Sequence, residues 1–239
     1  MENVLMRKYM ILLPVLFSMS CADNSKNNKI STLDFSINES ILITTDTMKQ
    51  QINSDFERLD IEWLEENGEK YPSDEYSTYI YDLRTDSTYI QVNGNNVSGY
   101  SSSKYLQGEY FYIFKDYYNN GNIKEKGIRF HSGPFKKGVW YEFDINGKLV
   151  KTIDYDQFYK FTFEDVLLFC EKKNILIEKA ILKPSTGLHT SINRWFDESL
   201  GKYTWTVSWL ITPEIKQILT LDGNTGKIIK TEDLEYINI

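Results

Sequence analysis

The sequence predicts an α+β fold, in which an antiparallel, hairpin-rich sheet follows an N-terminal helix and precedes a C-terminal helix laid on a second sheet. Three observations support this prediction. Aromatic residues make up 15% of the chain, with 17 Tyr, and such residues are enriched in strands. From Tyr76 onward, short Tyr, Ile and Val runs alternate with Asp, Asn and Gly, which indicates antiparallel strands joined by tight turns. Apolar residues recur at helical spacing in one segment before this region and in another after it.

The N-terminal helix is expected from Thr47 to Asn67, with Gly68 as its stop. Its apolar residues follow one another at steps of four, four, three and four, which is the spacing of one helix face. They are Met48, Ile52, Phe56, Leu59 and Trp63. We interpret this stripe as part of the core, and a groove for a partner is the alternative.

The first 20 residues have the form of an export signal. The basic pair Arg7 and Lys8 precedes an apolar run of about eight residues, whereas a helix that spans a bilayer needs roughly 20. Glu2 is unusual in the basic region and favours a translation start at Met6. The mature chain is therefore expected outside the cytoplasm.

Small residues and a cysteine close this signal. The segment Ser18-Met19-Ser20-Cys21 runs directly into polar chain, and it resembles the lipobox of bacterial lipoproteins, with Ser18 where leucine is commonest. The resemblance implies cleavage before Cys21, lipidation of that cysteine, and a lipid-anchored place in the cell envelope, at the outer membrane and facing the periplasm or the surface. More than one acyl chain makes such anchoring stable. The alternatives are a cleaved signal without lipidation and a core helix with the appearance of a signal.

The composition divides the chain into four parts. Residues 1–20 are the signal peptide, and residues 21–32 are polar, lack aromatics and have the composition of a flexible tether. Residues 33–155 hold the expected helix and the hairpin-rich region. Residues 156–239 hold the second unit of helix and sheet.

Charge and cysteine content argue against some classes of function. A net charge of −7, a pI near 5.0 and the lack of a Lys/Arg-dense block disfavour nucleic-acid binding. If Cys21 carries lipid, Cys170 is the one cysteine left, so no disulfide framework is available. Cys170 lies on an amphipathic segment, which favours a buried packing role over a reactive thiol.

Two segments repeat at a spacing of 26 residues. Tyr117–Lys124 and Phe143–Val150 each place an aromatic before Asn-Gly and an aliphatic residue two positions after it. Asn-Gly readily adopts the positive φ angles of a type I′ turn, so each segment is expected to close a hairpin. With Lys136-x-Gly-x-Trp140 between them, residues 117–155 resemble the MORN-variant repeats of antitoxin-like bacterial proteins. The resemblance implies an antitoxin-like role, and two copies are too few for a free-standing array.

The C-terminal part opens with a helix that is expected from Thr162 to Lys173. Thr162 supplies a capping hydroxyl and acids follow in the first turn. Large residues alternate with Thr and Ser from Tyr203 to Trp209, which indicates a strand with one buried face. The expected strands are residues 175–182, 189–196, 202–210, 216–221 and 227–231.

The end of the chain carries a second resemblance. Trp205-x-Val207, followed by Asp222-x-x-Thr225-Gly226-Lys227, is similar to the closing hairpin of PepSY-like domains. The resemblance implies a helix laid on an antiparallel sheet. It also implies a non-catalytic role, inhibitory or ligand-holding.

No pattern of catalytic or metal-binding residues stands out. His131 and His189 are the two histidines, 58 positions apart, and surface or packing roles are expected for both. Nucleophile-elbow, zinc-protease and phosphate-loop motifs do not occur. Asp222–Gly226 lacks the spaced acids of a calcium loop, so we interpret it as a turn. The sequence predicts no catalytic residue, no metal and no cofactor, although carboxylates distant in sequence can still meet in space.

The run Tyr105–Phe114 is apolar on both of its alternating faces. This pattern favours a doubly buried central strand over an aromatic platform for glycans or peptides.

Together these observations favour a non-enzymatic binding protein that is anchored to an envelope membrane through Cys21. The most specific interpretation is an immunity-type lipoprotein with a protein partner, a periplasmic toxin. The alternatives are a glycan- or peptide-binding surface lipoprotein, an envelope assembly component and a carboxylate-dependent hydrolase. Exposed aromatics around a concavity would favour the glycan-binding alternative. The side chains that test it are Tyr110, Tyr112, Trp140, Trp205 and Trp209.

Overall fold

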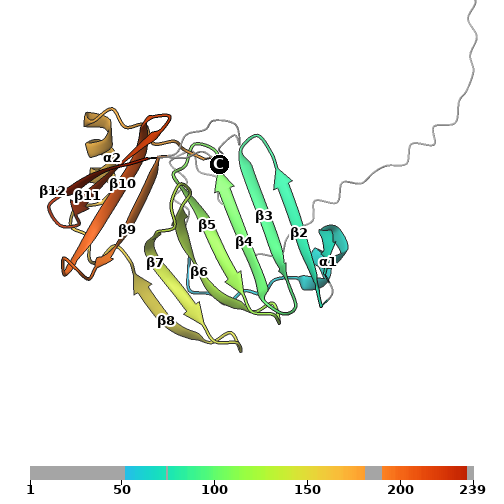
Figure 1. Cartoon of the computed structure of the whole chain (residues 1–239). Coiled ribbons are helices and arrows are strands. Elements are labelled where there is room, and N and C mark those ends of the chain that lie inside the picture. Colours follow the sequence, from blue (N-terminus) through green and yellow to red (C-terminus); the bar gives the residue numbers. More distant parts are fainter. Residues whose placement is uncertain (1–51, 74, 181–189, 236–239) are drawn as a thin grey trace, which may run out of the picture. The chain divides into compact units, whose positions relative to one another are not determined.

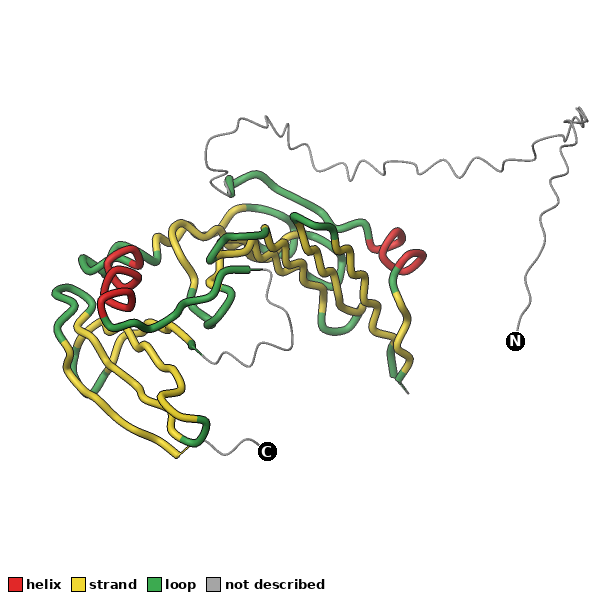
Figure 2. Tube along the Cα trace, turned by 90° about the horizontal axis from the view of Figure 1, so that it is seen from above, coloured by secondary structure: helices red, strands yellow, loops and turns green. Residues whose placement is uncertain are grey.

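The fold is rich in β-structure. A computed structural model describes residues 52–73, 75–180 and 190–235, which lie in one compact unit spanning 42–239. Over these ranges the chain forms twelve strands in two antiparallel sheets and two short helices (Figures 1 and 2). The expected α+β class is therefore wrong. The helices have only 7 and 10 residues, and most of the chain runs in successive hairpins.

The first sheet has eight strands whose order in the sheet is their order in the chain (Figure 1). Each strand pairs antiparallel with the next, so every connection is a hairpin turn. The strands are β1 (Glu69–Pro72), β2 (Ser77–Arg84), β3 (Thr88–Asn95), β4 (Gly99–Leu106), β5 (Phe111–Tyr117), β6 (Ile123–Phe130), β7 (Lys136–Phe143) and β8 (Leu149–Asp154).

The two repeated segments close the β5–β6 and β7–β8 hairpins, as expected. Their turns are of another type, because Gly121 and Gly147 have φ near +84° and +85° whereas Asn120 and Asn146 do not enter the positive region. The bonds Gly121 N–H to Tyr118 O and Gly147 N–H to Asp144 O are both 2.9 Å long. Each hairpin then carries a bulge next to its turn. A turn followed by a left-handed glycine and a bulge replaces the expected type I′ turn.

The run Tyr105–Phe114 is not one strand. Gly108 has φ +83° in a turn that separates β4 from β5. The two halves pair with each other, and Tyr105 lies directly opposite Tyr112. The apolar pattern on both faces belongs to two short strand ends rather than to a doubly buried strand.

The expected N-terminal helix is wrong over most of its length. Helix α1 spans only Ile61–Asn67, and the Asp60 side chain caps it by accepting a hydrogen bond from the Trp63 N–H at 2.9 Å. Asp55–Leu59, here called the strap, runs extended along the sheet and forms an isolated bridge between Arg58 and Asn122. Residues 47–51, with Met48, lie outside the described residues.

The second sheet has the order β12-β11-β10-β9 (Figure 1). Its strands are β9 (Ser191–Asp197), β10 (Lys202–Thr212), β11 (Ile215–Asp222) and β12 (Ile228–Glu235). These four match the strands expected from residue 189 onward. No strand forms at 175–180, and 181–182 lie outside the description.

Helix α2 (Phe163–Lys172) begins where the sequence indicates. Thr162 and Asp165 form a capping box, in which each side chain bonds the other residue's backbone N–H. This arrangement satisfies two of the free N–H groups of the first turn. The helix buries Phe163, Val166 and Cys170.

Two apolar cores hold these elements. The first lies between the strap, α1 and one face of the eight-stranded sheet, and it contains Leu59, Leu64, Val92, Tyr100, Tyr117, Ile123 and Phe143. The second joins the end of that sheet to α2 and the four-stranded sheet, and it includes Phe130, Phe135, Phe163, Val166, Trp205, Val207 and Leu221. Trp205 and Val207 of β10 are buried in this core and Trp209 packs against it, so the predicted buried face is confirmed, and Thr204, Thr206 and Ser208 on the other face are buried as well.

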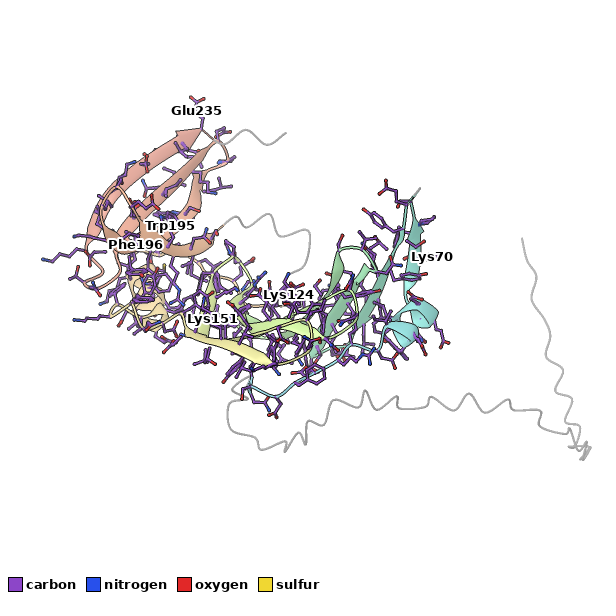
Figure 3. The ribbon with its side chains drawn as sticks, turned by 90° about the horizontal axis from the view of Figure 1, so that it is seen from below. Lys70, Lys124, Lys151, Trp195, Phe196 and Glu235 are labelled. Atoms are coloured by element: carbon purple, nitrogen blue, oxygen red, sulfur yellow. The ribbon has the colours of Figure 1, made fainter. Side chains whose placement is uncertain are left out.

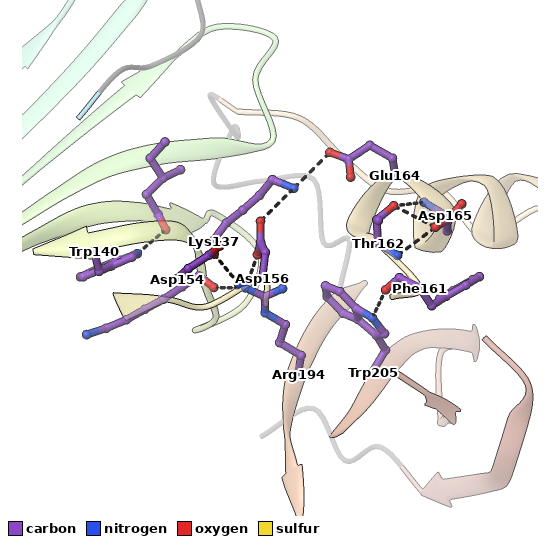
Figure 4. A network of polar contacts seen from close by, with 12 residues as sticks. Lys137, Trp140, Asp154, Asp156, Phe161, Thr162, Glu164, Asp165, Arg194 and Trp205 are labelled. Atoms are coloured by element: carbon purple, nitrogen blue, oxygen red, sulfur yellow. Dashed lines mark hydrogen bonds and ion pairs between the residues drawn. The ribbon is translucent and has the colours of Figure 1, made fainter. Parts of the chain in front are cut away.

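Polar contacts reinforce the second core, at a place called here the junction (Figure 4). The Arg194 guanidinium donates to Asp156 Oδ1 at 2.6 Å and to the Lys136 carbonyl at 2.5 Å. Lys137 pairs with Glu164 at 3.1 Å, at the start of α2. The Trp205 indole N–H donates to the Phe161 carbonyl at 2.8 Å. The junction thus links β7, α2 and β9 through side chains that are far apart in sequence.

Candidate binding face

The eight-stranded sheet has two chemically different faces. One carries the first core and lies under the strap and α1. Alternate residues of a strand point to opposite sides, and the opposite face carries uncharged polar and aromatic side chains on β3 and β4, with charged side chains on the strands beside them. We call it the polar face; its residues include Asp82, Arg84, Tyr89, Gln91, Asn93, Ser101, Ser103, Tyr105, Tyr112, Phe114, Asp116, Glu125 and Arg129.

A row of tyrosines crosses the polar face. Tyr89, Tyr105 and Tyr112 lie directly opposite one another on β3, β4 and β5. Their rings stack with centroid distances of 5.6 and 4.4 Å. The Arg84 guanidinium lies over the Tyr89 ring at 4.8 Å and ends the row. Cross-strand aromatic pairs of this kind stabilise a sheet and hold each other's rotamers.

Hydrogen bonds fix the polar side chains beside this row. The Tyr89 hydroxyl donates to Asp82 Oδ1 at 3.0 Å, and the Gln91 amide donates to the same oxygen at 3.1 Å. In the next strand pair the Ser101 hydroxyl donates to Asn93 Oδ1 at 3.1 Å. The side chains of β2, β3 and β4 are therefore arranged before any partner binds.

The hydroxyls of Tyr89 and Tyr105 stay protonated at neutral pH. Burial raises the pKa of Tyr105 to about 12, and the neighbouring Tyr112 adds to the effect. Burial, followed by the hydrogen bond to Asp82, raises the pKa of Tyr89 as well. Tyr89 and Tyr105 are thus neutral phenols, each with one donor and an acceptor oxygen.

Packed aromatic and charged groups support one end of the polar face. The Arg129 guanidinium lies 3.7 Å from the Phe114 ring centroid, and Lys136 Nζ lies 4.0 Å from that of Trp140. Trp140 is fully buried, and its indole N–H donates to the Ile128 carbonyl at 3.2 Å. Gly127 lies directly beneath this indole. This end of the face is rigid.

The described cysteine, histidine and turn residues that the sequence singled out, Cys170, His131 and Asp222, take no part in the polar face. Cys21 and His189 lie outside the described residues. His131 Nε2 is 2.7 Å from the Glu178 carbonyl, and burial lowers the pKa of the imidazole. Cys170 is buried in the second core, and burial raises the pKa of its thiol to about 12. Asp222 bonds the N–H groups of Asn224 and Thr225 at 3.0 Å, so this segment is a turn, as interpreted.

The aromatic side chains that test the glycan alternative mostly lie inside the protein. Trp140 and Trp205 are fully buried, and Tyr110 and Trp209 pack against the second core. Only Tyr112 of this set belongs to the polar face. The signal that could have located this face was the alternation of Tyr, Gln, Asn and Ser along 88–95 and 99–106. Recognising it requires knowing that the two segments pair.

Comparison with known proteins adds no assignment. No family model matches the chain, and no curated protein sequence matches it. Across the described ranges, no three His, Cys, Asp or Glu side chains gather in a way that could hold a metal ion. No helix in the same ranges has the length and hydropathy needed to cross a membrane.

Proposed function

We propose that this protein is a non-enzymatic binding lipoprotein, held in the cell envelope by lipid on Cys21, which binds a protein partner through the polar face. The observation that carries the proposal is the composition of that face. Tyr, Ser, Asn and Gln fill its middle strands. Antibody paratopes use the same residue types, because Tyr gives rigid contact area while Ser and Asn adapt their hydrogen bonds.

Preorganisation supports a binding role. The stacked rings of Tyr89, Tyr105 and Tyr112 are already held in place, so little side-chain entropy is lost when a partner binds. Both ring faces of Tyr105 are covered by its neighbours, and Arg84 lies over the ring of Tyr89, so a sugar cannot stack on either face of Tyr105. This geometry favours a protein partner over a glycan.

The specific form of the proposal is an immunity-type lipoprotein that neutralises a toxin arriving in the envelope. It is supported by the resemblance of residues 117–155 to antitoxin-like repeats and by the lipobox at Cys21. A lipid anchor would keep the binding face close to the compartment that such a toxin enters.

Protection of a host cell tests the binding role. The products of the reading frames adjacent to this gene are each exported to the periplasm of a bacterial host, with or without the full chain. We expect one of them to be toxic and the full chain to restore growth. Ser103→Arg places a long charged side chain in the middle of the polar face and should abolish protection. Ser54→Arg, at an exposed position on the opposite side of the sheet, should keep it.

Two results would contradict the proposal: that no adjacent product is toxic, or that Ser103→Arg protects as well as the unchanged chain. Thermal unfolding of both variants checks that they are folded. The anchor is tested separately by labelling cells with radioactive palmitate. The unchanged chain should take up the label, and Cys21→Ser should not.

A further inference from the structure

Four Asn-Gly pairs occur in the chain, and the structure holds their asparagine side chains differently. The pairs are Asn67-Gly68, Asn93-Gly94, Asn120-Gly121 and Asn146-Gly147. In such a pair the glycine backbone nitrogen can attack the carbonyl carbon of the asparagine side chain, because glycine has no Cβ to obstruct the approach. The attack requires the side chain to turn toward that nitrogen. Hydrogen bonds to the side chain therefore oppose it.

Asn67 and Asn93 are held within regular elements. Asn67 Nδ2 donates to the Trp63 carbonyl at 2.8 Å in the last turn of α1. Asn93 Oδ1 accepts from the Ser101 hydroxyl at 3.1 Å, and β3 is paired on both sides. Attack at either position thus requires a hydrogen bond to break and part of a helix or sheet to open.

Asn120 and Asn146 occupy equivalent positions in the two repeated turns. In each turn the glycine N–H donates a bond of 2.9 Å across the turn, so the backbone gives neither glycine an advantage. The side chains differ. Asn120 Nδ2 donates to the Ile145 carbonyl at 3.1 Å, and its Oδ1 accepts from the Asn122 N–H at 3.0 Å. Asn146 is exposed, and its side-chain amide bonds no residue in the described ranges.

The turn that contains Asn146 lies at an open edge of the first sheet. It closes the β7–β8 hairpin, and β8, which carries Lys151, ends the eight-stranded sheet (Figure 3). Five of the six β8 residues are exposed. Segments with few buried contacts open locally at a low free energy. Asn146 therefore combines an unbonded side chain with a backbone that can move.

We infer that Asn146 is a site of spontaneous deamidation. The Gly147 backbone nitrogen forms a bond to Asn146 Cγ, and the side-chain amide leaves as ammonia with the proton of that nitrogen. The product is a five-membered succinimide. Water then opens the ring at one of its two carbonyl carbons, which gives aspartate or isoaspartate at position 146. One water is consumed for each ammonia released, and no oxidant or reductant is needed.

Isoaspartate at position 146 would loosen the turn and its contact with the strap. Asp144 Oδ1 accepts from the N–H groups of Asn146 and Lys148 at 3.0 and 2.9 Å. The Phe56 ring of the strap lies directly against Gly147. Isoaspartate adds one methylene group to the main chain between these groups, whereas aspartate adds only a negative charge. We expect the isoaspartate form to open more readily in β7 and β8.

Ageing of the purified full chain tests the assignment. The chain is incubated at pH 8 and 37 °C, and peptide mass spectrometry follows deamidation at all four Asn-Gly pairs. We expect Asn146 to react about tenfold faster than Asn120, since the two side-chain hydrogen bonds of Asn120 must break before attack. Methylation by an isoaspartyl methyltransferase should then label the peptide that contains residue 146.

The unfolded chain is the matched control. In a urea concentration that unfolds the protein, the side-chain bonds of Asn120 are lost, and the rates at Asn120 and Asn146 should agree within about threefold. A second control separates the two products. Asn146→Asp adds the charge without lengthening the main chain, so its hydrogen exchange in β7 and β8 should match that of the fresh parent chain. The aged chain should exchange faster there.

Three results would overturn the inference. They are no reaction at Asn146 in the folded chain, equal rates at Asn120 and Asn146 in the folded chain, and a ratio of these rates that urea leaves unchanged. In the last case the local sequence alone would control the reaction. Neither the lipid anchor nor a partner enters this test, so the inference goes beyond the proposed function, and its failure would leave that function standing.

Discussion

Gly127 shows how a single residue supports the polar face. Its Cα lies beneath the indole of Trp140, and a methyl group there would overlap the ring. Trp140 is fully buried, with its N–H bonded to Ile128, so the ring has no space to retreat. We expect Gly127→Ala to lower the free energy of unfolding by about 3 kcal/mol, the upper part of the range for overpacking. Urea unfolding followed by circular dichroism measures the change.

A control at Gly108 separates steric overlap from backbone strain. Gly108 has φ +83°, and nothing lies within 4 Å of a methyl group placed there. Gly108→Ala should therefore cost only about 1 kcal/mol, the strain of a left-handed alanine. Equal losses in the two variants would show that the contact with Trp140 has no energetic role.

For single residues, the sequence predicts the structure where the residues that determine it are close together in the chain. The capping box at Thr162 and the turn at Asp222 depend on residues within a few positions, the burial of Cys170 was indicated by the amphipathic pattern around it, and each matches its prediction. The packing of Trp140 on Gly127 was not visible in the sequence, because it depends on the pairing of β6 with β7. The polar face was missed for the same reason, since its tyrosines meet across three strands.

The strap is the element that sequence periodicity misassigned. Leu59 and Trp63 of the predicted stripe do pack in the first core, but Phe56 is 50% exposed and the helix begins only after its N-cap, Asp60. The strap instead binds the sheet through Glu57, which pairs with Lys115 and Lys126. Those lysines lie 58 and 69 positions further along. A local pattern carries no information about partners at that separation.

Glu57 makes the strap sensitive to acid. Burial alone would raise the pKa of this carboxyl, but the two lysines outweigh burial and hold the pKa below its ordinary value near 4.5. A lowered folded-state pKa contributes stability that is fully present above pH 4.5 and is lost as the pH falls through the folded-state value. We expect Glu57→Gln to lower the free energy of unfolding by about 3 kcal/mol at pH 7, because it leaves the buried Lys126 unpaired. The loss should shrink below pH 4.5.

Urea unfolding at pH 7, 5 and 3.5 measures both effects. Glu62→Gln, on the exposed surface of α1, serves as a matched control and should change stability by less than about 0.5 kcal/mol. A Glu57→Gln loss that stays constant across the three pH values would contradict the assigned ion pairs.

At the scale of the whole molecule, the junction determines whether the two sheets unfold together. The second core contains Phe130 of β6 and Phe135 of the β6–β7 turn, as well as Trp205 and Val207 of β10. Arg194 lies in this core with its guanidinium 5.1 Å from the Phe135 ring and 4.6 Å from the Tyr159 ring. Its side chain is 5% exposed and joins Asp156 to the Lys136 carbonyl. Shared packing of this kind favours one cooperative transition.

Replacing Arg194 should uncouple the sheets. Arg194→Met keeps the apolar stem but removes both polar contacts. We expect it to lower the free energy of unfolding by about 2 kcal/mol, which is less than for a fully buried ion pair because Asp156 is partly exposed. Hydrogen exchange followed by mass spectrometry should give equal opening free energies for β5–β6 and β10–β11 in the parent chain. In Arg194→Met the opening free energy of β10–β11 should fall more than that of β5–β6. Lys202→Met removes the exposed ion pair with Asp222, and it should change neither opening free energy by more than about 0.5 kcal/mol. An equal fall in both sheets would mean that the apolar core alone couples them, because Arg194 would then stabilise the molecule without linking its parts.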